Sequence, residues 1–90
     1  MSVTERDLVL KNKYGLHARP ATLLAEVANG FKSDVTVIKD GQEVNGKGIF
    51  GLMMLAAECG STLRVRASGD DSEALVAAIE KVIEGKFNEE

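Results

Sequence analysis

The sequence has few of the residues that stabilise small disulfide-bonded or metal-binding domains. Its 90 residues include one cysteine, one histidine, one proline and no tryptophan. A single cysteine cannot form an internal disulfide, and with one histidine it cannot provide the ligands of a structural zinc site. We therefore expect no disulfide and no metal site, and a reducing, cytoplasmic location.

Long apolar runs and an excess of positive charge are also missing. The apolar stretches fall far short of the ~20 residues that a membrane-spanning helix needs, and the polar start Met-Ser-Val-Thr-Glu-Arg does not fit a secretory signal. The 11 basic and 14 acidic side chains give a net charge of −3, whereas a domain that binds nucleic acid needs a basic surface. We expect neither membrane insertion nor nucleic-acid binding.

The remaining composition indicates one folded domain over residues 1–90. Hydrophobic residues make up 44% and charged residues 28% of the chain, which is typical of globular proteins and unlike disordered ones. The chain is too short to bury two separate cores. Because aromatic residues make up only 4%, the core is expected to be mainly aliphatic.

The spacing of the apolar residues predicts alternating strands and helices. Period-two stretches predict strands and stretches of period 3.6 predict helices. The expected strands are Val3–Leu10, Asp34–Lys39, Gln42–Asn45 and a stretch around Leu63–Ala67; the expected helices are Ala18–Asn29, Ile49–Ala57 and a last one that opens at Asp70 and ends at Gly85. This βαββαβα order predicts an α+β open-faced sandwich, in which three helices cover one face of a four-stranded antiparallel sheet.

Several local signals refine these boundaries. Asp40-Gly41 predicts a tight hairpin turn between two of the strands. Asp70, with Glu73 three residues later, predicts a capping box at the start of the last helix. Gly60 is expected to end the second helix, and Cys59 beside it to be a small, partly buried residue without chemistry.

The only histidine lies where the first helix begins, in the segment Gly15-Leu16-His17-Ala18-Arg19-Pro20-Ala21. A single histidine near a helix end is usually a cap or a half-buried surface residue. Here, however, the helix start presents unpaired backbone N–H groups and a partial positive charge, and Arg19 adds a permanent cation. These features predict an anion site beside a nucleophilic nitrogen. The segment has no carboxylate next to the histidine, so a general-base triad is poorly supported.

This segment resembles the active-site motif of the HPr family, the histidine-containing phosphocarriers of the bacterial phosphotransferase system. The resemblance extends over essentially the whole chain. It implies that Enzyme I, charged from phosphoenolpyruvate, phosphorylates His17 on Nδ1, and that the group then passes to a histidine of an enzyme IIA. It also implies that Arg19 steadies the phosphoryl group and that the backbone N–H groups of Ala18 and Arg19 contact it.

The resemblance thus predicts a carrier rather than a stand-alone enzyme, with no metal or small cofactor of its own. We expect a monomer, because a carrier must expose its histidine to successive partners. The alternative is a regulatory binding protein of the same fold, whose partner choice is set by phosphorylation of His17.

The glycine-rich segment Gly46-Lys47-Gly48-Ile49-Phe50-Gly51 matches the spacing of a dinucleotide-binding loop. We do not expect that function, because the preceding strand is a short polar hairpin arm rather than a buried parallel strand. The glycines are expected to provide a tight entry into the second helix.

The second helix has apolar residues on more than one face, so part of it must meet solvent or a partner. Leu52 and Leu55 are expected in the core. In the HPr family this helix forms an apolar docking patch beside the histidine. The positions of this chain that match the docking surface are Ala18, Thr22, Lys47, Ile49, Phe50 and Met53.

Two departures from the family pattern concern regulation and partners. Gly48 stands where many members have a serine that a dedicated kinase phosphorylates, so that control is expected to be absent here. Glu26 and Asn29 stand where lysines are common, so pairing with an acidic partner is expected to be weaker or rearranged. The nitrogen-related branch, NPr, also differs at such positions, and the sequence leaves the branch and the cognate enzyme IIA open.

Overall fold

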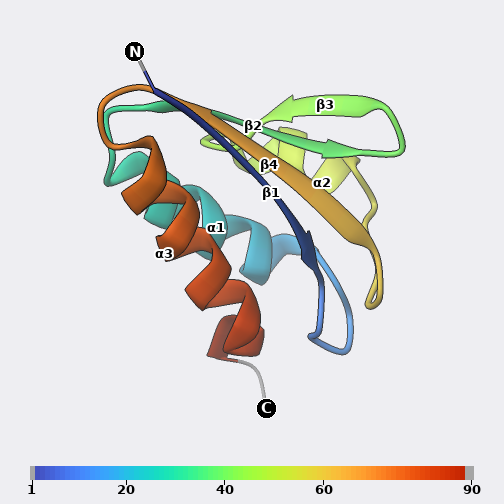
Figure 1. Cartoon of the computed structure of the whole chain (residues 1–90). Helices are drawn as coiled ribbons and strands as arrows, with labels where there is room; N and C mark the ends of the chain where they lie inside the picture. Colours follow the sequence, from blue (N-terminus) through green and yellow to red (C-terminus); the bar gives the residue numbers. More distant parts are fainter. Residues whose placement is uncertain (1, 89–90) are drawn as a thin grey trace.

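Strands and helices follow one another in the expected βαββαβα order (Figure 1). The computed structural model describes residues 2–88. Its elements are β1 (Val3–Val9), α1 (Ala18–Asn29), β2 (Asp34–Lys39), β3 (Gln42–Asn45), α2 (Ile49–Met54), β4 (Thr62–Ser68), α3 (Ser72–Glu84) and a final 3₁₀ turn, η1 (Lys86–Asn88).

The strands form one four-stranded sheet in the order β1-β4-β2-β3. Every pairing is antiparallel: β1 with β4, β4 with β2, and β2 with β3. The hairpin predicted at Asp40-Gly41 joins β2 to β3, and both central residues adopt the positive φ that this turn requires, 52° at Asp40 and 84° at Gly41. The predicted fold class is therefore confirmed.

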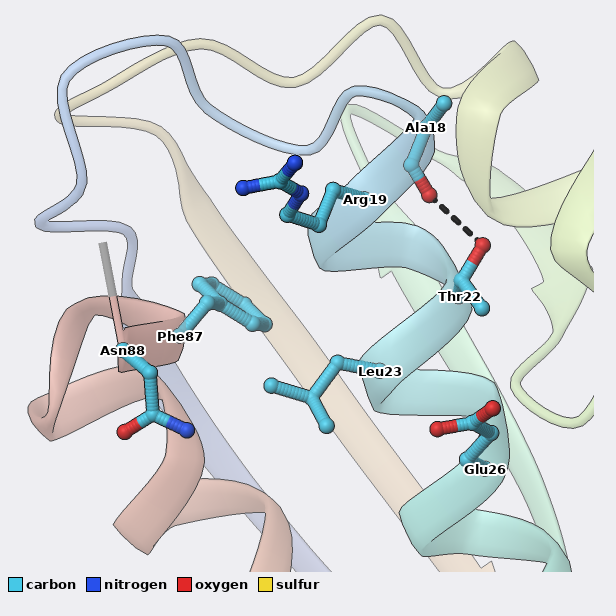
Figure 2. A pocket seen from close by; sticks show the side chains of 7 residues that line it. All are labelled: Ala18, Arg19, Thr22, Leu23, Glu26, Phe87 and Asn88. Carbon is cyan, nitrogen blue, oxygen red and sulfur yellow. Dashed lines mark hydrogen bonds between the residues drawn. The ribbon is translucent and has the colours of Figure 1, made fainter.

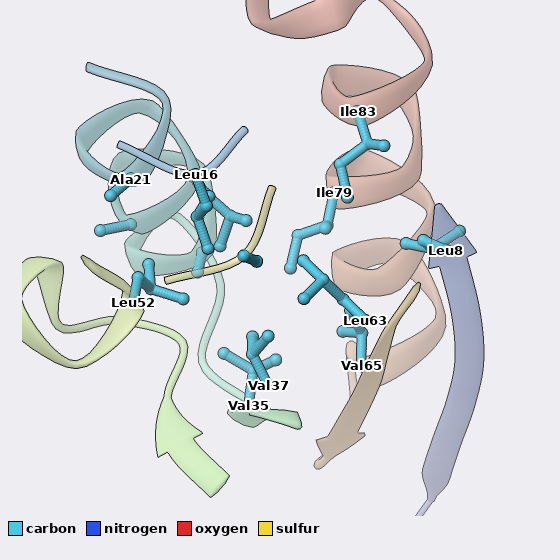
Figure 3. Close-up of a cluster of buried hydrophobic side chains, with 14 of the residues drawn as sticks. Leu8, Leu16, Ala21, Val35, Val37, Leu52, Leu63, Val65, Ile79 and Ile83 are labelled. Atoms are coloured by element: carbon cyan, nitrogen blue, oxygen red, sulfur yellow. The ribbon is translucent and has the colours of Figure 1, made fainter. Parts of the chain in front are cut away.

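One face of the sheet is buried beneath the helices (Figure 3). Alternate strand residues point to this face, where they meet the apolar stripes of α1 and α3. The strands contribute Leu8, Val35, Val37, Leu63 and Val65, while α1 contributes Ala21, Leu24, Ala25 and Ala28 and α3 contributes Leu75, Val76, Ile79 and Ile83, all of them buried. Burial of one such large aliphatic side chain stabilises the fold by about 1.5–3 kcal/mol, so this aliphatic layer holds the two main helices on the sheet.

The opposite face of the sheet meets solvent. There Arg64 donates to Asp7 (Nε to Oδ1, 2.9 Å) and Arg66 donates to Glu5 (Nε to Oε2, 2.8 Å), each pair lying directly across β1 and β4. The hydrogen bond from Arg64 lowers the pKa of Asp7. No helix within residues 2–88 is long and apolar enough to cross a membrane.

The second helix is shorter than the sequence predicts. α2 ends at Met54 with Leu55 as its C-cap, rather than continuing to Ala57 and Gly60. The chain leaves the helix because Ala56 adopts a positive φ of 51°, and the carbonyl of Ala57 accepts a hydrogen bond from the N–H of Leu16 (2.8 Å). Cys59, in the loop that follows, is exposed rather than partly buried.

The predicted capping box at the start of α3 is wrong. The N-cap is Asp71 rather than Asp70, and its side chain does not cap the helix. Instead the Asp71 carboxylate accepts hydrogen bonds from the N–H groups of Lys32 and Ser33, both 2.9 Å, and from the hydroxyl of Ser33. The aspartate thus ties α3 to the loop between α1 and β2.

These bonds make the Asp71 contact sensitive to pH. The hydroxyl of Ser33 and then the N–H of Lys32 lower the pKa of Asp71 from 3.8 to about 2. Because the folded state holds the charged form, the contact stabilises the fold above pH ~4, and this stabilisation is lost as the pH falls toward 2.

We predict that Asp71→Asn unfolds at a lower urea concentration than the wild type at pH 7, because the amide accepts weaker hydrogen bonds than the carboxylate. The difference in midpoint urea concentration between wild type and variant should shrink between pH ~4 and ~2, where the wild-type carboxylate becomes protonated. Asp70→Asn removes the same charge from an exposed neighbour and serves as the control. Equal differences at pH 7 and pH 2.5 would contradict the assignment.

Candidate functional site

His17 is the N-cap of α1 and is exposed. Its backbone is extended (φ −86°, ψ −166°), and its carbonyl accepts the first helical hydrogen bond, from the N–H of Ala21 (2.9 Å). Its side chain forms no capping bond to the helix. The imidazole therefore lies at the surface, where a second protein can reach it.

The first turn of α1 offers two backbone N–H groups to an anion beside His17. Ala18 and Arg19 occupy the first two helical positions, where an N–H has no acceptor within the helix. Pro20 follows and has no N–H, and the N–H of Ala21 is already bonded. The two backbone contacts expected for a phosphoryl group are thus the two amides that the helix leaves available.

Arg19 adds the cation of the site. Within residues 2–88, the Arg19 guanidinium has no hydrogen bond or ion pair that would occupy it, and the residue is exposed. Arg19 lines a hollow of about 620 Å³ between α1 and the C-terminal turn. Figure 2 shows its side chain above those of Leu23 and Phe87, which line the same hollow. The expectation that this guanidinium steadies a phosphoryl group stays a prediction.

The loop before His17 is held by specific contacts. Gly15 is buried and has a positive φ of 72°, and a Cβ at this position would lie 2.7 Å from the Cα of Glu58. The side-chain amide of Asn12 donates to the Gly15 carbonyl (Nδ2 to O, 2.7 Å). Leu16 is buried, and its N–H bonds to Ala57. These contacts fix the position at which α1, and with it His17, begins.

α2 presents an exposed apolar surface near this histidine. The exposed fraction is 82% for Phe50, 71% for Met54, 39% for Met53 and 38% for Ile49, whereas Leu52 and Leu55 are buried as predicted. Met53 and His17 line the same hollow of about 300 Å³. We call Ile49, Phe50, Met53 and Met54 the α2 patch; its member Met54 was not among the docking residues predicted from the sequence.

Two other residues expected to dock a partner lie on α1. Ala18 is exposed and Thr22 is half-buried. The Thr22 hydroxyl donates to the carbonyl of Ala18 (Oγ1 to O, 2.7 Å; Figure 2), so a partner would meet mainly its methyl group.

Lys47 lies away from His17, at the opposite end of α1. Its ammonium donates to the carbonyl of Phe31 (Nζ to O, 2.8 Å), and its own carbonyl accepts a hydrogen bond from Asn29 (3.1 Å). Both side chains thus join the C-terminal end of α1 to the loop before α2. A role for Lys47 in docking stays a prediction.

The glycine-rich segment does not form a dinucleotide site. It follows β3, which pairs antiparallel at the edge of the sheet, whereas that motif requires a buried parallel strand. Gly46 instead packs closely under β2, since a Cβ there would lie 2.8 Å from Cγ1 of Val35. The part of the chain that the structure describes also holds no cluster of histidine, cysteine and acidic residues fit for a metal ion.

Comparison with known proteins identifies the family. A family model described as "PTS HPr component phosphorylation site" matches residues 4–85. The chain belongs to the HPr family. The relatives that this chain matches include phosphocarrier proteins named HPr and NPr, so the family and the fold expected from the sequence are confirmed.

Relatives from both branches of the family cover nearly the whole chain. Phosphocarrier protein HPr of Xylella fastidiosa is 41% identical over 86 residues, 96% of this chain and 97% of its own. Phosphocarrier protein NPr of Shewanella violacea is 35% identical over 89 residues, 99% of this chain and 98% of its own. The crystal structure of HPr-C-His from Thermoanaerobacter tengcongensis superposes with a TM-score of 0.93 at 44% identity, covering 97% and 98% of the two chains.

We predict that Gly15→Ala destabilises the protein by about 2–5 kcal/mol, through strain at positive φ and overlap with the backbone at Ala57 and Glu58. Gly41→Ala is the matched control, because Gly41 also has a positive φ (84°) but a Cβ there would meet no atom within 4 Å. Urea unfolding of both variants separates the strain at positive φ, which both share, from the backbone overlap, which only Gly15→Ala suffers. Equal losses would show that the close approach of the His17 loop to residues 57 and 58 contributes nothing.

Proposed function

We propose that the protein accepts a phosphoryl group on His17 from phosphorylated Enzyme I, whose own group comes from phosphoenolpyruvate, and passes it to a histidine of an enzyme IIA. The observation that carries this proposal is the exposed imidazole at the N-cap of α1, next to two available amides and the exposed guanidinium of Arg19. We further propose that the protein acts as a monomer, which leaves this end of α1 open to each partner in turn.

The chemistry needs only a nucleophile and a place for the charge. A nitrogen–phosphorus bond forms at His17 as the bond between phosphorus and the donor breaks, and the reverse happens at the acceptor. In this proposal the N–H groups of Ala18 and Arg19 and the Arg19 guanidinium donate hydrogen bonds to the negative phosphoryl oxygens. Because helix-end interactions of this kind contribute about 0.3–1 kcal/mol each, and up to ~2 when partly buried, the group is held without being trapped.

The α2 patch gives this carrier an apolar anchor for its partners. Phe50 and Met54 are the most exposed apolar side chains of the patch, and methionine adapts to surfaces of different shape. A surface that binds a donor and then an acceptor must be accessible to both and must adapt to two shapes. Exposed apolar side chains give the access, and methionine gives the adaptability. The four residues of the α2 patch, Ile49, Phe50, Met53 and Met54, are therefore our docking residues on α2.

Charges around the patch bear on partner choice. Glu26 is exposed on α1, and the polar groups of Asn29 and Lys47 are used within the protein. Long-range attraction to an acidic partner is therefore weaker than it would be with lysines at positions 26 and 29. The proposal covers both a sugar-transport and a nitrogen-related enzyme IIA as acceptor.

We predict that Enzyme I and radiolabelled phosphoenolpyruvate convert the protein into an acid-labile, base-stable phosphoprotein, and that His17→Ala abolishes the label. His17 is the only histidine, so label remaining on the variant would place the site on another residue type and refute the proposal. Adding sugar-type or nitrogen-type enzyme IIA should then remove the label from the wild type. Label retained with both would refute a carrier and favour the regulatory binding protein.

We also predict that Phe50→Ala raises the KM for transfer from Enzyme I by about tenfold, the effect of removing a well-packed aromatic anchor, while the far-UV circular dichroism stays unchanged. Val3→Ala is the control, since Val3 is 62% exposed on the solvent face of the sheet, outside the α2 patch. Loss of folded structure in Phe50→Ala, or equal kinetics for the two variants, would show that Phe50 is not a docking residue.

A further inference from the structure

Tyr14 is a large aromatic side chain that the fold leaves in water directly beside His17. It is 68% exposed, so its burial contributes little to folding. Its ring lies edge-on to the imidazole, with the ring centroids 6.0 Å apart and the ring planes at 81°. This distance and angle are those at which aromatic rings attract each other.

The surrounding loop fixes the position of this ring. Tyr14 precedes Gly15, whose positive φ and close packing against Glu58 leave the backbone little freedom. Buried Leu16 anchors the chain on the other side. The ammonium of Lys13 lies 5.3 Å from the centroid of the Tyr14 ring, within the range of a cation–π contact. The anchored backbone and the contact with Lys13 therefore both restrain Tyr14, and its ring faces the histidine.

We propose that Tyr14 is a positioning residue that holds the imidazole of His17 in the orientation needed for phosphoryl transfer. The part of this inference that concerns transfer rests on the proposed function. The contact itself belongs to the unphosphorylated protein and can be tested without any partner.

The orientation of the imidazole matters for an exposed N-cap histidine that takes part in group transfer. Its side chain makes no capping bond to the helix, so the helix does not fix the ring by the usual route for an N-cap residue. In-line transfer between two proteins requires the attacking nitrogen to face the phosphorus within a narrow range of angles. An aromatic neighbour limits the rotation of the imidazole and leaves its exposed side open to the partner.

The hollow beside the histidine supports the same role. Tyr14 and Met53 line it together with His17, and it opens toward solvent between the His17 loop and α2. A donor group entering this hollow would meet the imidazole with Tyr14 as one wall. The edge-on contact is a contact of the aromatic ring itself, so phenylalanine should replace tyrosine without loss.

The first experiment follows the carbon-bound imidazole protons of His17 by NMR in the wild type, Tyr14→Phe and Tyr14→Leu. His17 is the only histidine, so its resonances are assigned without ambiguity. We expect Tyr14→Leu to shift both resonances, through loss of the aromatic ring current, and Tyr14→Phe to keep them near the wild-type positions. Unchanged resonances in Tyr14→Leu would overturn the ring contact, whatever the outcome of the labelling experiment on the wild type.

The second experiment measures transfer from Enzyme I to the same three proteins. We expect Tyr14→Leu to lower kcat by about three- to tenfold with little change in KM, which is the rate equivalent of losing one aromatic pair, and Tyr14→Phe to restore it. Unchanged kcat, or a raised KM alone as expected for the α2 patch, would overturn the positioning role. If the wild type itself is not labelled, the proposed function fails, and the NMR result still decides the contact.

Discussion

The site depends on one backbone hydrogen bond, from the N–H of Leu16 to the carbonyl of Ala57 (2.8 Å). It joins the loop that precedes α1 to the loop that follows α2, two segments far apart in the sequence. Gly15 permits the bond, because any larger residue would overlap the backbone at Ala57 and Glu58. The same junction fixes where α1 begins, seats Tyr14 beside the histidine, and brings the α2 patch alongside His17. The histidine, the two amides and the α2 patch are therefore positioned by the same junction.

Stability and function occupy different parts of the molecule. The apolar stripes of α1, α3 and the inner face of the sheet are almost fully buried, so they stabilise the fold and cannot contact a partner. α2 has only six residues, buries Leu52 and leaves most of its other apolar side chains in water. That exposure costs free energy in the isolated protein, and binding of the partners proposed above would recover it. A short helix suits this use because the core does not depend on it for most of its buried area.

The sequence predicted the fold well where apolar periodicity and turn residues agree. Asp34–Lys39 and Gln42–Asn45 were predicted to the residue, because the Asp40-Gly41 turn fixes the hairpin and Val35 and Val37 set its buried face. The errors lie where a long-range contact overrides a local preference. Asp71 gives its carboxylate to the loop at Ser33 instead of to its own helix, and α2 stops early because Ala57 bonds to Leu16. Lys47 and Tyr14 show the same limit, since no local pattern reveals that one side chain reaches Phe31 and the other faces His17.

The absence of a serine at position 48 is not imposed by the fold. Gly48 is the N-cap of α2 with an ordinary extended backbone (φ −110°), and a Cβ there would lie 3.7 Å from the carbonyl oxygen of Asn45, its nearest neighbour. A serine would fit and would satisfy an amide of the helix start. The fold thus keeps the space for a hydroxyl while the chain does not supply one. Position 48 of this chain therefore offers no hydroxyl for a modification at the entry to α2, although the fold would accommodate one.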